Sequence, residues 1–162
     1  MNMKKLSMIL TTLFGIGILI FNSCGTVPIT GRRQLNLVSD GEILAASATQ
    51  YRQFISKSQL SRNSTYNNKV TQVGRRLAAA TNIYLKQNGY ESMLSTLNWE
   101  FNVVDSKQVN AFCMPGGKIV VYTGLLNLVG NGAHSDDELA AVMGHELSHA
   151  LAKHANERIS NQ

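Results

Sequence analysis

The sequence predicts an α+β domain that follows an export segment and a tether. Apolar residues recur at helical spacing in three stretches, 40–55, 66–88 and 136–152. Between residues 97 and 123, apolar and polar residues alternate or form short β-branched runs, which is typical of strands. The 162 residues suit one domain, so we expect helices around a small sheet.

Residues 1–23 have the composition of a signal peptide. Lys4 and Lys5 precede an uncharged run from Leu6 to Phe21, which is shorter than the roughly 20 residues that span a membrane. The small residue before Cys24 makes this stretch similar to the lipobox of bacterial lipoproteins, in which the cysteine is acylated after cleavage. The match is incomplete, because Phe21 and Asn22 replace the usual residues. An uncleaved anchor and plain secretion therefore remain alternatives, and all three routes export the chain.

Lipid on Cys24 would anchor the protein in the cell envelope, facing the periplasm, with the outer membrane favoured over the inner one. It would also leave Cys113, the second cysteine, without a disulfide partner. Without Lys4 and Lys5, 13 basic and 10 acidic residues give a net charge of +3, with no dense basic run. We therefore expect membrane contact through the lipid and no nucleic-acid binding.

The first part of the mature chain combines a tether and two helices. Pro and Gly predict an extended, lipid-anchored tether over 24–38, followed by the domain at 39–162. Ser39 is expected to cap a helix from Asp40 to Ile55. A second helix is predicted from Tyr66 to Asn88 and ends before a glycine.

The strands follow these helices. Alternation from Leu97 to Val103 predicts a half-buried strand. Asn110–Met114 and Lys118–Thr123 flank Pro115-Gly116-Gly117, which predicts a β-hairpin. A connection over 124–134, with one possible helical turn, leads to the last helix.

That helix contains His145-Glu146-Leu147-Ser148-His149. Ser135 and Glu138 are spaced as a capping box, and two aspartates complement the helix dipole. The expected buried residues of this helix are Leu139, Val142, Met143 and Leu147.

The spacing of these polar residues predicts a zinc site. His145 and His149 lie about 40° and one turn apart on a helix, so both imidazoles can bind one Zn²⁺. Glu146 lies about 100° round from His145, where it can act as the general base on a metal-bound water. Zinc lowers the pKa of such a water to about 7, which favours peptide hydrolysis with Glu146 as the catalytic residue. A chance coincidence of two histidines and a glutamate is the alternative.

Three stretches, 27–38, 110–126 and 137–158, make the chain resemble the HtpX and CAAX-prenyl-endopeptidase family of gluzincin zinc metallopeptidases, metallopeptidase family forty-eight, in its short bacterial lipoprotein type. The resemblance implies a zincin-like fold, with the β-hairpin sheet over the metal helix and a cleft between them. It also implies one Zn²⁺ per chain and polypeptide substrates.

In this family the strand corresponding to Asn110, Ala111 and Phe112 pairs with an extended substrate, while an ordinary buried strand is the alternative. Cys113 replaces a small residue. It is either an inhibitory ligand or, as we favour, a buried and unreactive cysteine.

Catalytic zinc needs three protein ligands, and this helix supplies two. On a continuous helix, His154 points about 180° away from His145, and Glu157 lies two turns beyond His149, so we expect neither to be the third ligand. The resemblance implies a glutamate on a later helix, beyond Gln162. The chain is then expected to be C-terminally truncated, either as a fragment or as an incomplete homologue, with little or no activity.

These observations favour a zinc-dependent endopeptidase of the bacterial envelope that acts on misfolded or unfolded proteins, a role in protein quality control. One alternative is a non-catalytic envelope lipoprotein that binds substrates or assembly partners. Another is a truncated product without a stable fold.

Overall fold

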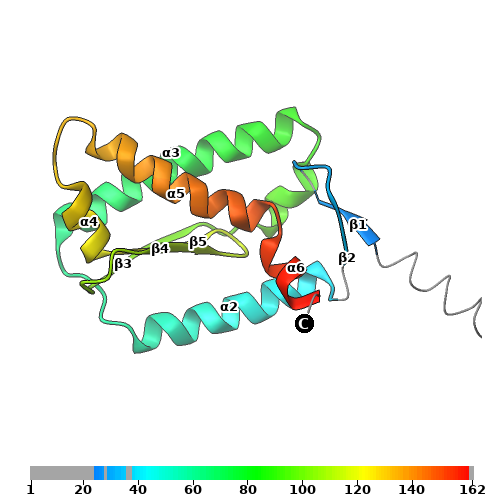
Figure 1. Cartoon of the computed structure of the whole chain (residues 1–162), viewed down its shortest axis with the longest axis horizontal. Coiled ribbons are helices and arrows are strands. Elements are labelled where there is room, and N and C mark those ends of the chain that lie inside the picture. The colour runs from blue at the N-terminus through cyan, green and yellow to red at the C-terminus, as the bar shows by residue number, and fades with distance from the viewer. Residues whose placement is uncertain (1–23, 28, 36–37, 161–162) are drawn as a thin grey trace, which may run out of the picture.

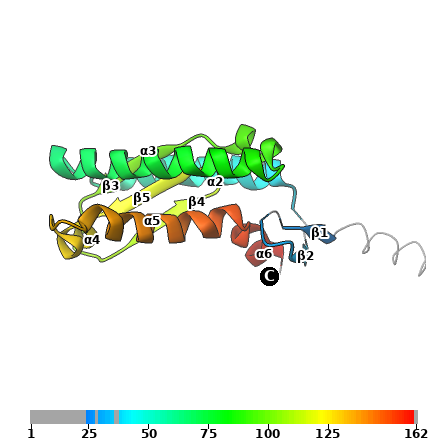
Figure 2. The same ribbon diagram turned by 90° about the horizontal axis from the view of Figure 1, so that it is seen from above.

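The computed structural model describes residues 24–27, 29–35 and 38–160, and the predicted signal peptide lies outside them. The architecture is α+β, mostly helical, with a small three-stranded sheet. Two helices, α3 and α5, lie side by side over one face of this sheet, and α2 covers the other face (Figures 1 and 2). Among the described residues, no helix has both the length and the apolar character needed to cross a membrane.

The sheet consists of β3 (Glu100–Val104), β4 (Ala111–Met114) and β5 (Lys118–Tyr122) in the order β3-β5-β4. β5 is antiparallel to β4, which confirms the predicted hairpin, and parallel to β3. β3 starts at Glu100, three residues later than the predicted Leu97, and follows a 3₁₀ helix, η1 (Glu91–Thr96). The central strand is almost entirely buried, as its short apolar run requires.

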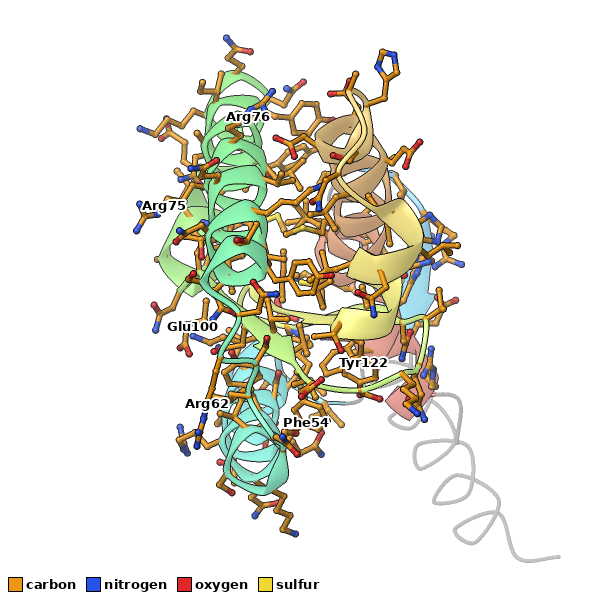
Figure 3. The ribbon with its side chains drawn as sticks, turned by 90° about the vertical axis from the view of Figure 1, so that its left-hand side faces the viewer. Phe54, Arg62, Arg75, Arg76, Glu100 and Tyr122 are labelled. Carbon is orange, nitrogen blue, oxygen red and sulfur yellow. The ribbon has the colours of Figure 1, made fainter. Side chains whose placement is uncertain are left out.

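The two long helices confirm the sequence prediction with small shifts of their ends. In α2 (Asp40–Lys57), Ser39 caps the helix in a complete capping box with Glu42. In α3 (Ser64–Gln87), the helix starts two residues early because Asn63 caps it through its side chain. Arg75 and Arg76 are exposed on the outer side of α3, as predicted (Figure 3).

The two faces of the sheet have separate cores. On the α2 face, Tyr51 packs with Val104 and Val120. On the opposite face, buried residues from α3, α5 and the sheet form the larger core: Val70, Val73, Val103, Ala111, Ile119, Val121, Leu125, Leu126, Leu139 and Met143. The metal-helix candidate α5 is therefore attached to the sheet through this larger core.

The predicted capping box of α5 (Ser135–Leu151) was wrong. Ser135 is the first residue of the helix and is buried, and His134, the N-cap, makes no side-chain capping bond. Instead, Lys69 Nζ donates to Ser135 Oγ at 2.7 Å and to the Gly130 carbonyl at 2.8 Å. This nearly buried cation needs acceptors, and the turn between α4 (Thr123–Val129) and α5 supplies them.

The expected continuous helix from residue 136 to Glu157 was also wrong. Lys153 has a φ of 55°, and a separate helix, α6 (His154–Ser160), folds back toward α2 (Figure 1). A left-handed non-glycine residue costs about 1 kcal/mol. Asp40 offsets this cost, since its carboxylate pairs with Lys153 and accepts a hydrogen bond from Asn156 at 2.8 Å.

The predicted tether has an extended backbone, but it is paired and not free. β1 (Cys24–Thr26) and β2 (Arg33–Leu35) form an antiparallel hairpin in which Cys24 opposes Leu35. Gly31 has a φ of 64° in the connecting turn, a conformation that suits glycine. β2 contacts α6, so the N-terminal hairpin packs against the helix that follows α5.

Replacing Gly124 with alanine should destabilise the fold by about 1–3 kcal/mol. A Cβ there would overlap the carbonyl oxygens of Lys107 and Gln108, which are backbone atoms in the loop before β4 and cannot rotate away. Gly41→Ala is the matched control, because a Cβ on Gly41 in α2 meets open space and should stabilise the chain by about 0.5–1 kcal/mol. Urea unfolding measures both changes, and an equal stability of the two variants would contradict the close contact at Gly124.

Candidate active site

The orientation of α5 follows from its buried side. Leu139, Met143 and Leu147 recur at every fourth position and are 0%, 0% and 4% exposed. Burial of this stripe turns other positions of the helix outward, and His145 and His149 are both exposed. Glu146 lies between these two sides and is half-buried.

The two histidines converge through the same ring nitrogen. His145 Nε2 and His149 Nε2 are 3.0 Å apart. Two nitrogens bound to one tetrahedral zinc at about 2.0–2.1 Å would be about 3.4 Å apart. The two imidazoles could therefore bind a single metal ion if the rings moved slightly apart.

A cleft of about 760 Å³ lies beside this pair. Glu146 and His149 line it, whereas His145 lies outside its lining. The lining residues come from the β1–β2 hairpin, α2, the β4 region, α5 and α6: Arg32, Ile43, Ala46, Ser47, Gln50, Phe112, Cys113, Met114, Pro115, Glu146, His149, Ala150, His154, Ala155, Glu157 and Arg158. A carboxylate and an imidazole thus face a space large enough for part of a polypeptide.

The three residues expected to bind substrate occupy different environments. Phe112 lines the cleft and packs edge-to-face against Phe54 and Tyr122, with ring centroids 5.2 and 6.3 Å away. Ala111 is buried in the larger core, and the Asn110 carbonyl accepts a hydrogen bond from the Tyr122 backbone at 3.0 Å. Within the described residues β4 has β5 as its only strand partner, so it is an edge strand.

Cys113 follows Phe112 along this edge and also lines the cleft. Burial, and secondarily the Glu146 carboxylate, raises the pKa of its thiol to about 12. The thiol therefore stays protonated at neutral pH, which disfavours it as a metal ligand. In the part of the chain that the structure describes, no group of three or more histidine, cysteine, aspartate or glutamate side chains could bind a metal together.

His154, which a continuous helix would turn away, instead lies against His149. The break at Lys153 brings the two Nδ1 atoms to 2.7 Å, with ring centroids 4.9 Å apart. No glycine or proline marks this break in the sequence, so the spacing argument missed the contact.

An ion pair from a distant part of the chain crosses the same region. Arg32, between β1 and β2, makes two parallel hydrogen bonds to the Glu157 carboxylate, one of them at 2.9 Å. The residues are 125 positions apart, so no local pattern could have predicted the pair. It connects α6 to the N-terminal hairpin at the wall of the cleft.

The known proteins to which the chain is similar include several proteases. It is 32% identical over 146 residues to mitochondrial metalloendopeptidase OMA1 of Schizosaccharomyces pombe, covering 90% of this chain and 40% of that protein. Metalloprotease LoiP of Escherichia coli is 41% identical over 54 residues, with 33% and 19% coverage. The β-barrel assembly-enhancing protease of Yersinia pestis is 33% identical over 64 residues, with 40% and 12% coverage.

The chain thus spans less than half the length of these relatives. These relatives are OMA1, LoiP and the β-barrel assembly-enhancing protease. The expected specific resemblance to HtpX and CAAX-prenyl endopeptidases is not found among them. The family model for peptidase family M48 matches residues 64–162, which include α3, the sheet, α5 and α6. This match covers more than half of the chain, which therefore belongs to peptidase family M48, a family of metallopeptidases.

Proposed function

We propose that the chain carries the catalytic centre of a zinc-dependent endopeptidase, with His145 and His149 as ligands and Glu146 as general base. The observation that carries the proposal is the 3.0 Å separation of the two Nε2 atoms, beside a cleft that Glu146 lines. Membership of a metallopeptidase family supports a metal at this position. Two imidazoles form part of the three-ligand sets that zinc takes in hydrolases, and the neighbouring Glu146 carboxylate is the base and not a ligand.

Bound zinc would act as a Lewis acid that makes a water molecule acidic. Glu146 would take the proton of the attacking water and return it to the leaving amine, because its half-buried carboxylate borders the cleft. The free edge of β4 would align an extended peptide through backbone hydrogen bonds, next to Phe112.

The described residues supply two ligands, and a hydrolytic zinc needs a third. We therefore expect the chain alone to bind zinc more weakly than a three-ligand site and to cleave peptides slowly.

The proposed setting is the bacterial cell envelope, with lipid on Cys24 and misfolded or unfolded proteins as substrates. The charged start and apolar run of the first 23 residues support export. The name of the Yersinia pestis relative refers to β-barrel assembly, and β-barrels are typical of outer membranes. An extended peptide bound at a strand edge must be unfolded locally, which favours unfolded substrates.

A binding role without cleavage is the second candidate. The open edge of β4 and the incomplete ligand set favour it. Such an envelope lipoprotein would bind unfolded chains or assembly partners equally well with or without the Glu146 carboxylate.

Replacing His149 with alanine should abolish zinc binding, because one of the two converging nitrogens is lost. Titration of the purified 162-residue chain with Zn²⁺ by calorimetry measures this. His134→Ala is the matched control, since His134 precedes α5 and its side chain is 86% exposed. Zinc binding that survives the loss of His149 would contradict the proposed centre.

Glu146→Gln should preserve zinc binding and lower the cleavage of unfolded casein by about 100-fold or more, because the amide cannot accept the water proton. Glu138→Gln, at the exposed first turn of α5, is the control and should match the wild type. Cleavage is measured with and without a chelator. Loss of zinc from Glu146→Gln would instead indicate a structural role for Glu146. If the wild type and Glu146→Gln both bind casein equally well and neither cleaves it, the second candidate, a binding role, is favoured.

Cys113 should react slowly with iodoacetamide at pH 8, since its pKa of about 12 leaves very little thiolate. Unfolding in urea should restore the rate of an ordinary thiol, measured by mass spectrometry of the Cys113 peptide. Because the folded pKa lies above the unfolded value of 9.0, this thiol stabilises the fold below pH 9, and that contribution decreases as the pH rises toward 12. Rapid labelling of the folded chain would show that Cys113 is an exposed thiolate.

A further inference from the structure

His149 makes a contact through each of its two ring nitrogens. Its Nε2 lies 3.0 Å from His145 Nε2, and its Nδ1 lies 2.7 Å from His154 Nδ1. The first nitrogen is the one that the proposed zinc centre uses. The second, on the other side of the ring, has no role in that centre.

The chemistry of imidazole restricts how these contacts can be made. A neutral imidazole carries one N–H, so a ring that offers the lone pair of Nε2 to a metal has its proton on Nδ1. At 2.7 Å, one Nδ1 donates a hydrogen bond and the other accepts it. When His149 binds metal through Nε2, its Nδ1–H is therefore the donor and His154 Nδ1 is the acceptor.

The fold positions His154 for this contact. Lys153, with its left-handed backbone, ends α5 and turns the chain so that α6 begins at His154. The Asp40 carboxylate contacts both Lys153 and the buried Asn156, one on each side of His154. His154 is itself half-buried at the wall of the cleft, so its ring is more restricted than a free surface imidazole.

We propose that His154 is a positioning residue: it accepts the Nδ1–H of His149 and so selects the tautomer and ring orientation in which Nε2 of His149 faces the metal. This inference rests on the proposed zinc centre. His154 is not the missing third ligand in this arrangement, because it contacts the nitrogen opposite to the metal-binding one. Partners of this kind orient metal-binding histidines, and their loss typically lowers metal affinity about 10-fold to 100-fold.

The test compares His154→Phe, which retains a ring but has no acceptor, with His154→Asn, whose amide oxygen can accept the same hydrogen bond. His134→Phe is the control for loss of a histidine elsewhere in the chain. All proteins are the 162-residue chain purified in detergent, and circular dichroism verifies their folding.

The first readout is the tautomer of His149 in the metal-free chain, measured from imidazole ¹⁵N shifts at about pH 8. The expected result is an Nδ1–H tautomer in the wild type, in His154→Asn and in the control, and a shift toward Nε2–H in His154→Phe. An Nε2–H tautomer in the wild type, or no change in His154→Phe, would overturn the proposal.

The second readout is the affinity for Zn²⁺ alone by calorimetry. His154→Phe should weaken it about 10-fold to 100-fold, while His154→Asn should remain within about 3-fold of the wild type. One outcome would overturn the positioning role and leave the zinc centre intact: zinc binding requires His149, but His154→Phe changes neither the tautomer of His149 nor the zinc affinity. A tautomer shift in a chain whose zinc binding does not require His149 would overturn the zinc centre, and the positioning role with it.

Discussion

Burial of one stripe of α5 is the constraint on which the rest of the molecule depends. Leu139 and Met143 pack with the sheet and α3 in the larger core, Leu147 is 4% exposed, and each such buried side chain contributes about 1.5–3 kcal/mol. The helical period then decides where every other residue of α5 lies. The histidines face outward because the leucines and methionine face inward, so the same packing that stabilises the fold also sets the direction of the candidate ligands.

The site is assembled from separate parts of the chain. α5 supplies the histidines and Glu146, whereas β4 supplies the edge strand and Phe112. The other walls of the cleft come from α2, α6 and Arg32. A cleft of this kind requires the sheet, the helices on both of its faces and the N-terminal hairpin to be in place together.

Local patterns in the sequence predicted most of the fold, including the long helices, the β4–β5 hairpin and the placement of His145 and His149 on one side of a helix. Each depends on the period of apolar residues or on turn residues that act within a few positions. The break after Leu151 was not predictable in this way, because Asp40, more than a hundred residues earlier, stabilises it. The same holds for Lys69 at the start of α5 and for Arg32 with Glu157, where distant partners decide the local structure.

The central position of β5 also determines when the sheet can form during synthesis. β3 and β4 both precede β5 in the chain and do not pair with each other. Within the described residues, apart from a single bridge between Val104 and Leu60, neither therefore has a strand partner until residues 118–122 have left the ribosome. The short turn between β4 and β5 then allows rapid local pairing, whereas β3 must close a longer loop. Until α5 follows, the face that contains Ile119 and Val121 has only α3 and the short helix α4 over it among the described residues. The nascent chain therefore passes through a stage with an exposed apolar sheet face, the kind of surface that holdase chaperones bind.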